Sequence, residues 1–166
     1  MKIFIASDHA GFYLKKQLIQ YLGIKGYEVE DCGAFELDKG DNYPDIIIPC
    51  AQKVANDKDS LGIVIGGSGQ AEAIAANKVK NIRAALFYGP VRAKEAADIT
   101  GRQSSNPYEI VRLARMHNNA NVLSLGARFQ TPDDAKAAVT LFLETEFEGG
   151  RHIARLDKIE ELENSR

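Results

Sequence analysis

A short apolar run followed directly by glycines is the feature that most restricts how this chain can fold. Residues 61–65 read Leu-Gly-Ile-Val-Ile, and residues 66–69 read Gly-Gly-Ser-Gly. A continuous apolar run of this length is typical of a strand covered on both faces, as in a parallel sheet. The alanine-rich residues 71–78 that follow predict a helix. The sequence therefore predicts a buried strand, a glycine turn at its carboxyl end and then a helix.

Strand and helix patterns alternate along the rest of the chain. Because strands that alternate with helices form βαβ units, we expect an α/β protein with a mostly parallel sheet and helices on both sides. Residues 100–107 (TGRQSSNP) interrupt the alternation as a loop or flap. The expected strands are residues 2–6, 27–29, 61–65, 82–87 and 121–125, and the expected helices are residues 12–25, 44–54, 71–78, 91–98, 108–116, 133–146 and 152–163.

Length and charge limit the number of domains and the classes of partner. At about 150 residues per domain, the 166 residues predict a single domain over residues 1–166. The balance of 21 Lys+Arg against 23 Asp+Glu gives no basic face for nucleic acid. Cys32 and Cys50 fit neither a disulfide framework nor a zinc motif. With no apolar run of signal-peptide or membrane-spanning length in the sequence, we expect a cytoplasmic protein without a membrane partner.

The glycine turn is a candidate anion site. Backbone N–H groups between a strand and a helix can point at an anion. As a nucleotide motif the turn is weak, because the third glycine position, counted from Gly67, is Glu72 and no Lys-Ser/Thr pair follows. Glu72 has two interpretations. It either stabilises the first helical turn, by about 0.3–1 kcal/mol, or serves as a general base beside an anion-stabilising loop, which suits proton abstraction next to a carbonyl.

The histidines and a pair of arginines also have two interpretations each. His9 follows Asp8 at the end of the first strand, where the pair either caps a helix or lines a site. His117 lies where a helix ends, and a cationic histidine at this position commonly stabilises the helix through its dipole. Arg151 and Arg155 are four residues apart on one helical face, so they either grip a phosphate or form a solvated surface.

Several segments together resemble the ribose-5-phosphate isomerase B family, which includes the galactose-6-phosphate isomerase subunits. They occur in family order and cover nearly the whole chain. Each motif is weak alone, but the set is specific. The motifs are SDHAG (7–11), NYPD (42–45), GIVIGGSG (62–69), IAANK (74–78), IRAAL (82–86), HNNANVL (117–123), LGAR (125–128) and EGGRH (148–152).

The resemblance implies a Rossmann-like, three-layer αβα sandwich and reversible aldose–ketose isomerisation of a sugar phosphate, as in the pentose phosphate pathway, without metal or organic cofactor. It also implies a homodimer with active sites shared between subunits, or a dimer of such dimers. The helix at about residues 151–164 then packs on its own domain or serves as a dimer arm.

The resemblance also assigns roles to individual residues. His117 is expected to assist opening of the furanose ring, and Arg151 and Arg155 to bind the phosphate. Asp8 is expected to help ring opening, and Ser68 belongs to the catalytic set. The implied substrate-binding residues are Asp8, His9, Gly67, Ser68, Gly69, Gln70, Ala71, Asn118, Arg128, Arg151 and Arg155.

Two departures from the family pattern matter. Many members carry a catalytic Cys where this chain has Gly66, whereas a branch resembling the mycobacterial enzymes uses a Glu at the start of the next helix, the position of Glu72. Glu72 is therefore the predicted base that moves a proton between C2 and C1 through an enediolate. The second departure is an extra segment of roughly eighteen residues within residues 91–108, of undefined role.

Two alternative functions remain open from the sequence. One is the same chemistry on a hexose 6-phosphate such as allose or galactose 6-phosphate. The other is a non-catalytic module that binds a phosphorylated ligand with the glycine turn and the arginines alone.

Overall fold

The computed structural model describes residues 1–165 and contains one five-stranded sheet in which all neighbouring strands are parallel. The strand order is β2-β1-β3-β5-β4. The strands are β1 (Lys2–Ser7), β2 (Glu28–Asp31), β3 (Ser60–Gly66), β4 (Ala84–Phe87) and β5 (Val122–Gly126). The helices are α1 (Phe12–Ile24), α2 (Tyr43–Asn56), α3 (Gln70–Ala76), α4 (Glu109–Asn118), α5 (Pro132–Glu144) and α6 (Ile153–Asn164), with a short 3₁₀ turn, Gly150–His152, before α6.

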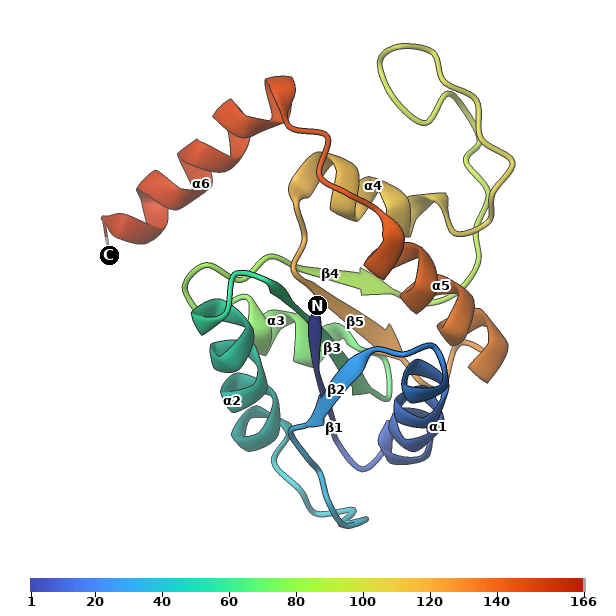
Figure 1. Ribbon diagram of the computed structural model, residues 1–166, viewed down its shortest axis with the longest axis vertical. Coiled ribbons are helices and arrows are strands. Elements are labelled where there is room, and N and C mark those ends of the chain that lie inside the picture. Colours follow the sequence, from blue (N-terminus) through green and yellow to red (C-terminus); the bar gives the residue numbers. More distant parts are fainter. Residues whose placement is uncertain (166) are drawn as a thin grey trace.

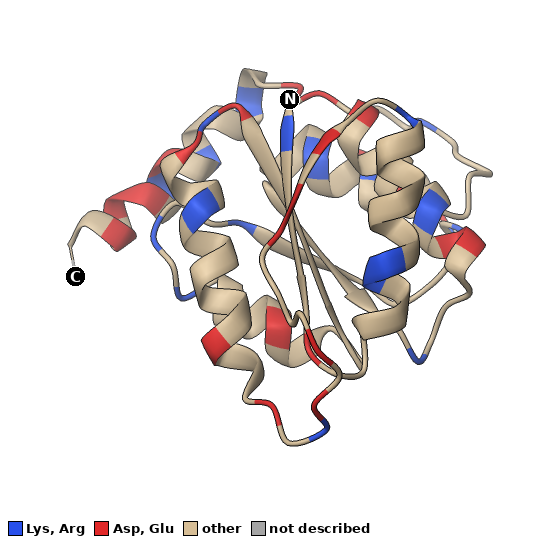
Figure 2. Ribbon diagram, turned by 60° about the horizontal axis from the view of Figure 1, so that its bottom comes forward, with Lys and Arg blue, Asp and Glu red and all other residues tan. Residues whose placement is uncertain are grey.

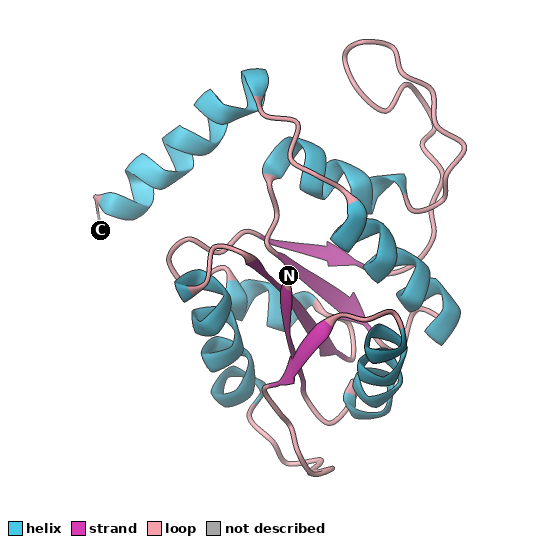
Figure 3. Cartoon of the chain, in the orientation of Figure 1, coloured by secondary structure: helices cyan, strands magenta, loops and turns pink. Residues whose placement is uncertain are grey.

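Helices cover both faces of the sheet, as Figures 1 and 3 show. One core contains residues of α1, α4 and α5 packed on the sheet, including Leu18, Val111 and Phe142. The other contains residues of α2 and α3, including Ile47 and Ala76. All seven residues of β3 are buried, as a central strand covered on both faces requires. The three-layer αβα, Rossmann-like sandwich is confirmed.

The strand order has a switch point between β1 and β3. The chain passes from β1 to β2 on one side and then returns to β3 on the other side of β1. In open α/β sheets, ligands bind at such a switch point, outside the carboxyl ends of the strands. Both β1 and β3 end there in short loops, residues 8–11 and 67–69, and Asp8 N–H donates to the Ile65 carbonyl at 3.1 Å.

The prediction of a helix at residues 91–98 is wrong, because these residues form an irregular segment, in which residues 91–96 are exposed. An eight-residue helix is too short to persist without tertiary packing. Here backbone hydrogen bonds from Val91 N–H to the Pro107 carbonyl and from Ala97 N–H to the Arg102 carbonyl, both 2.7 Å, fold the segment back on itself. The predicted strand at 27–29 lies at Glu28–Asp31, and the one at 82–87 begins only at Ala84.

The last helix, α6, projects from the body of the domain (Figure 1). None of its residues is buried, and its apolar side chains Ile153, Ile159 and Leu162 are about half exposed. Its outer end is tied down by Glu163, whose carboxylate accepts a hydrogen bond from Asn81 N–H at 3.1 Å. The amphipathic face of α6 is therefore left without a core of its own in this protomer.

Charge is distributed without a dominant sign. Acidic and basic residues are interspersed along the helices and loops in Figure 2, in agreement with the formal net charge of -2. Within residues 1–165, no helix has the length and hydrophobicity needed to span a bilayer.

Candidate active site

Asp8 is held rigidly at the carboxyl end of β1. Its side chain turns back onto the start of the next loop, where Oδ1 accepts hydrogen bonds from the N–H groups of Ala10 at 2.8 Å and Gly11 at 3.0 Å. Only 8% of Asp8 is exposed. The Asp8 carboxylate is thus a fixed, nearly buried negative group at the switch point between β1 and β3.

His9 is bound on two sides by Asp41, which lies just before α2. The Asp41 carboxylate accepts the His9 backbone N–H at 2.7 Å and contacts the ring Nδ1 at 2.6 Å. This hydrogen bond raises the pKa of His9 above its ordinary value. Asp41 therefore fixes the orientation of the imidazole and favours its cationic form.

The glycine turn presents N–H groups rather than carbonyls. The carbonyls of Gly66 and Gly67 accept hydrogen bonds from Ala127 and Arg128 at 2.8 and 3.1 Å. By contrast, the N–H groups of residues 67–69 make no hydrogen bond with any other part of residues 1–165. Gly69 takes a left-handed φ of 73° against Leu125, a conformation that favours glycine. The turn can therefore bind a negatively charged oxygen.

The Glu72 carboxyl occupies the space that a side chain at position 66 would fill. A Cβ built on Gly66 would lie 2.0 Å from Cδ of Glu72 and 2.2 Å from each of its oxygens. Glu72 is only 3% exposed. Burial, reinforced by the negative charges of Asp8 and Asp41, raises its pKa above the ordinary value. A buried carboxylate of increased basicity thus lies directly beside the glycine turn.

Arg128 completes this group from the loop after β5. A Cβ at Gly67 would lie 3.2 Å from the guanidinium carbon of Arg128, so the guanidinium packs against the turn. Its positive charge partly opposes the effect of Asp41 on the pKa of His9. Five predicted site elements therefore meet at the carboxyl edge of the sheet, which we call the carboxyl-edge cluster. They are Asp8, His9, the turn of residues 67–71 (Gly67, Ser68, Gly69, Gln70 and Ala71), Glu72 and Arg128.

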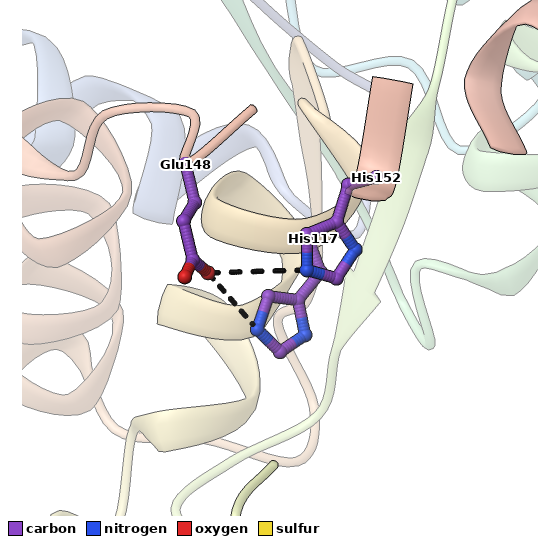
Figure 4. Close-up of side chains that lie close together, drawn as sticks. All are labelled: His117, Glu148 and His152. Atoms are coloured by element: carbon purple, nitrogen blue, oxygen red, sulfur yellow. Dashed lines mark ion pairs between the residues drawn. The ribbon is translucent and has the colours of Figure 1, made fainter. Parts of the chain in front are cut away.

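A second group lies around the end of α4. The rings of His117 and His152 stack with their centroids 4.3 Å apart, as Figure 4 shows. Both Nε2 atoms face one carboxylate oxygen of Glu148, at 3.5 Å from His117 and 3.9 Å from His152. Burial and the nearby charge of His117 lower the pKa of His152, which favours its neutral form. His152 and Glu148 thus hold the imidazole of His117 in place.

This histidine pair has the composition of a metal site but not its orientation. The potential ligand atoms of His117, Glu148 and His152 all lie within 4.8 Å of one another. However, the two rings are nearly parallel, with an interplanar angle of 10°. Their lone pairs therefore run side by side instead of converging on one point, and ligation of Zn²⁺ would require both rings to turn.

The remaining predicted residues surround the same histidines. Asn118, Arg151 and Arg155 line a cavity of about 360 Å³ together with His117 and His152. Two arginines and an imidazole give this cavity the chemistry of a phosphate site. We call His117, Asn118, Arg151 and Arg155 the arginine cluster.

The two clusters lie at opposite edges of the sheet. Residues of the carboxyl-edge cluster follow β1, β3 and β5, whereas His117 and Asn118 precede β5. The five residues of β5 alone span about 16 Å. Within one protomer, the structure therefore does not bring Glu72 together with the arginine cluster.

Comparison with known proteins decides the family. The pattern of the ribose/galactose isomerase family matches residues 3–103 and 99–159. The chain belongs to the ribose/galactose isomerase family.

Relatives in this family match over more than 90% of their own length. Ribose-5-phosphate isomerase B of Mycolicibacterium paratuberculosis is 40% identical over 166 residues, which covers 99% of this chain and 93% of that protein. The crystal structure of ribose-5-phosphate isomerase B from Mycoplasma genitalium with bound ribulose-5-phosphate has a TM-score of 0.86 and 40% identity, with 99% of this chain and 97% of that chain covered. The enzyme from Clostridium thermocellum has a TM-score of 0.84 at 38% identity, with 99% of each chain covered.

The family match also divides at one place in the chain. The match to the ribose/galactose isomerase family falls into two pieces that meet at residues 99–103. This junction lies in the irregular segment between β4 and α4, where the sequence predicts an extra segment within residues 91–108.

Sequence reasoning missed three contributors to these clusters. Asp41 was not singled out, although it binds His9 on two sides. Glu148 and His152 belong to the EGGRH motif of the family but received no role, although both contact His117. For His152, the signal was its place four residues after Glu148 in a motif that also carries Arg151.

Proposed function

We propose that this member of the ribose/galactose isomerase family interconverts ribose 5-phosphate and ribulose 5-phosphate, with Glu72 as the base. The position of the Glu72 carboxyl in the space beside Gly66 carries the proposal. A carboxylate that is 3% exposed and has a raised pKa suits proton abstraction from carbon. Relatives named ribose-5-phosphate isomerase B, one with bound ribulose-5-phosphate, support the choice of substrate.

In the proposed mechanism, one proton moves between two adjacent carbons. Glu72 removes the C2 proton of open-chain ribose 5-phosphate, and the electron pair shifts to the C1 oxygen, which gives an enediolate. The free N–H groups of residues 67–69 stabilise the negative oxygen, with Ser68 beside it. Glu72 then returns the proton to C1 while the proton of the C2 hydroxyl passes to the C1 oxygen, which leaves the C2 ketone and the C1 hydroxyl of ribulose 5-phosphate. The reaction balances without an oxidant or a reductant.

The arginine cluster binds the phosphate and, together with Asp8 of the carboxyl-edge cluster, opens the ring. His117, held by Glu148 and His152, donates a proton to the ring oxygen of the furanose as Asp8 accepts the one from the C1 hydroxyl. Arg151 and Arg155 bind the phosphate, because guanidinium groups match the geometry of phosphate oxygens.

We infer that the active site is completed in a homodimer. Glu72 and His117 lie at opposite edges of the sheet in one protomer, so a single site can contain both only if they come from two subunits. The exposed apolar face of α6, with Ile153, Ile159 and Leu162, provides a surface for the partner. We assign α6 as a dimer arm.

An activity panel tests the substrate. The purified protein is expected to isomerise ribose 5-phosphate faster than allose 6-phosphate or galactose 6-phosphate. Faster turnover of a hexose phosphate would overturn the pentose assignment. Binding without turnover of any of the three would favour a phospho-ligand-binding module instead.

Subunit mixing tests the shared site. Glu72→Gln and His117→Ala are each expected to be inactive, but mixed dimers contain one site with both native groups. After unfolding and refolding together at equal amounts, about half of the dimers are mixed and activity should return to about one quarter of wild type. No recovery, with mixed dimers present by mass spectrometry, would show that each site lies within one chain.

A further inference from the structure

The irregular segment between β4 and α4 is ordered by its own ion pairs. Arg102 bridges two carboxylates, with Nε 2.8 Å from Asp98 Oδ2 and Nη1 2.7 Å from Glu109 Oε1. Glu109, at the start of α4, is only 2% exposed and also accepts the Ser104 hydroxyl at 2.7 Å. Although the segment protrudes in Figure 1, it is therefore tied firmly to α4.

The tip of this segment reaches the arginine cluster. Ala97, Asp98 and Ile99 line the same 360 Å³ cavity as Arg151 and Arg155. The Asp98 side chain is 9% exposed, whereas residues 91–96 are all exposed. The segment thus places a largely buried carboxylate on the wall of a cavity that also contains two arginines, whose proposed ligand is an anion.

That carboxylate is already fully engaged within the segment. Asp98 accepts hydrogen bonds from Thr100 N–H at 2.9 Å and from the Thr100 hydroxyl at 2.6 Å, besides the Arg102 guanidinium. These contacts hold the pKa of Asp98 well below its usual range, so the group is anionic at neutral pH. Without Arg102, the negative charge would either pair with Arg151 or Arg155 or repel the phosphate.

We propose that residues 97–99 form a wall of the phosphate end of the substrate site, and that Arg102 keeps Asp98 paired so that Arg151 and Arg155 remain free for the phosphate. Arg102 is a positioning residue, because it acts through Asp98 and not on the substrate. The inference rests on the proposed function, since that function supplies the phosphorylated ligand. It gives the extra segment a part in substrate affinity.

Four variants test the proposal. Arg102→Gln is expected to raise the KM for ribose 5-phosphate roughly tenfold with kcat within about twofold of wild type, because one unpaired charge is left near the phosphate. Asp98→Asn should change KM by less than about threefold, and adding Asp98→Asn to Arg102→Gln should restore KM to that level. The matched control Arg92→Gln removes the same charge from the exposed part of the segment and should leave KM unchanged.

The dissociation constant of inorganic phosphate, measured by calorimetric titration, should change in the same way as KM. It should rise in Arg102→Gln, return in the double variant and stay unchanged in Arg92→Gln. A double variant no better than Arg102→Gln would overturn the proposal and leave Arg102 as a tether only. Equal KM values for Arg102→Gln and Arg92→Gln would also overturn it. If the dissociation constants of phosphate follow this pattern but the wild-type protein does not turn over ribose 5-phosphate, the proposed function fails while the role of Arg102 in phosphate binding stands.

Discussion

Replacing Gly66 with alanine should disable the enzyme while leaving its fold intact. The new Cβ would lie 2.0 Å from the carboxyl carbon of Glu72. Carbon atoms in contact lie about 3.5 Å apart, so the carboxyl must move by about 1.5 Å. A misplacement of about 1 Å at a reacting group costs about 10²-fold in rate, so kcat should fall at least 100-fold.

Stability should change much less than activity. Gly66 lies in β3 with a backbone conformation open to alanine, and the displaced group is the end of a flexible side chain. The free energy of unfolding is therefore expected to fall by about 1 kcal/mol, the low end for an added methyl group. Gly23→Ala is the matched control, because a Cβ there meets nothing within 4 Å and the residue lies in α1.

The assay compares kcat and denaturant unfolding for Gly66→Ala, Gly23→Ala, Glu72→Gln and the double variant Gly66→Ala/Glu72→Gln. If alanine at position 66 acts through Glu72, it should add no further loss in the Glu72→Gln background. Normal kcat in a folded Gly66→Ala variant would refute the reasoning, since the Glu72 carboxyl could then leave its present position without consequence.

Three further predictions concern charge and positioning. Glu72 has a raised pKa, so the folded state binds more protons than the unfolded state, and the free energy of unfolding falls as the pH rises above the ordinary value of 4.5. Glu72→Gln should therefore have a higher melting temperature than wild type at pH 8, and the difference should close towards pH 4. Equal melting temperatures at pH 8 would contradict this. His152→Ala should lower kcat roughly tenfold, a part of the about 10²–10⁴-fold that acid–base catalysis supplies, whereas His152→Phe keeps a stacked ring beside His117 and should lose less; equal losses would argue against stacking. Asp41 raises the pKa of His9, and this interaction stabilises the folded state below pH 6.5; the stabilisation is lost as the pH rises through the raised pKa of the folded state. Asp41→Asn should therefore lower the melting temperature more at pH 6 than at pH 9. A pH-independent effect would exclude this linkage.

Much of the fold could be predicted from apolar pattern alone. The apolar run at 61–65 and the glycines after it predict β3 and its turn, since a short apolar run bounded by glycines is typical of a strand covered on both faces. Residues 91–98 were wrongly predicted as helix because their composition favours a helix, while the decisive contacts, such as Arg102 with Glu109, are tertiary. Boundaries at β2 and β4 shifted because sheet pairing determines where strands begin.

The sites were predictable in residue type but not in arrangement. Asp41 is one of three carboxylates in a polar loop, with Glu36 and Asp38, and only its contact with His9 distinguishes it. That Glu72 fills the space at Gly66 depends on the path of the turn between them. The separation of Glu72 from His117 was available in principle, because residues that follow and precede parallel strands lie at opposite edges of the sheet.

The most direct test of Glu72 as the base is proton exchange with solvent. With ribose 5-phosphate in D₂O, the wild-type protein should introduce deuterium at C2 of recovered ribose 5-phosphate and at C1 of ribulose 5-phosphate, as followed by NMR. Glu72→Gln should bind ribose 5-phosphate with nearly unchanged affinity and show no exchange. Persistent exchange in Glu72→Gln would contradict the assignment of Glu72.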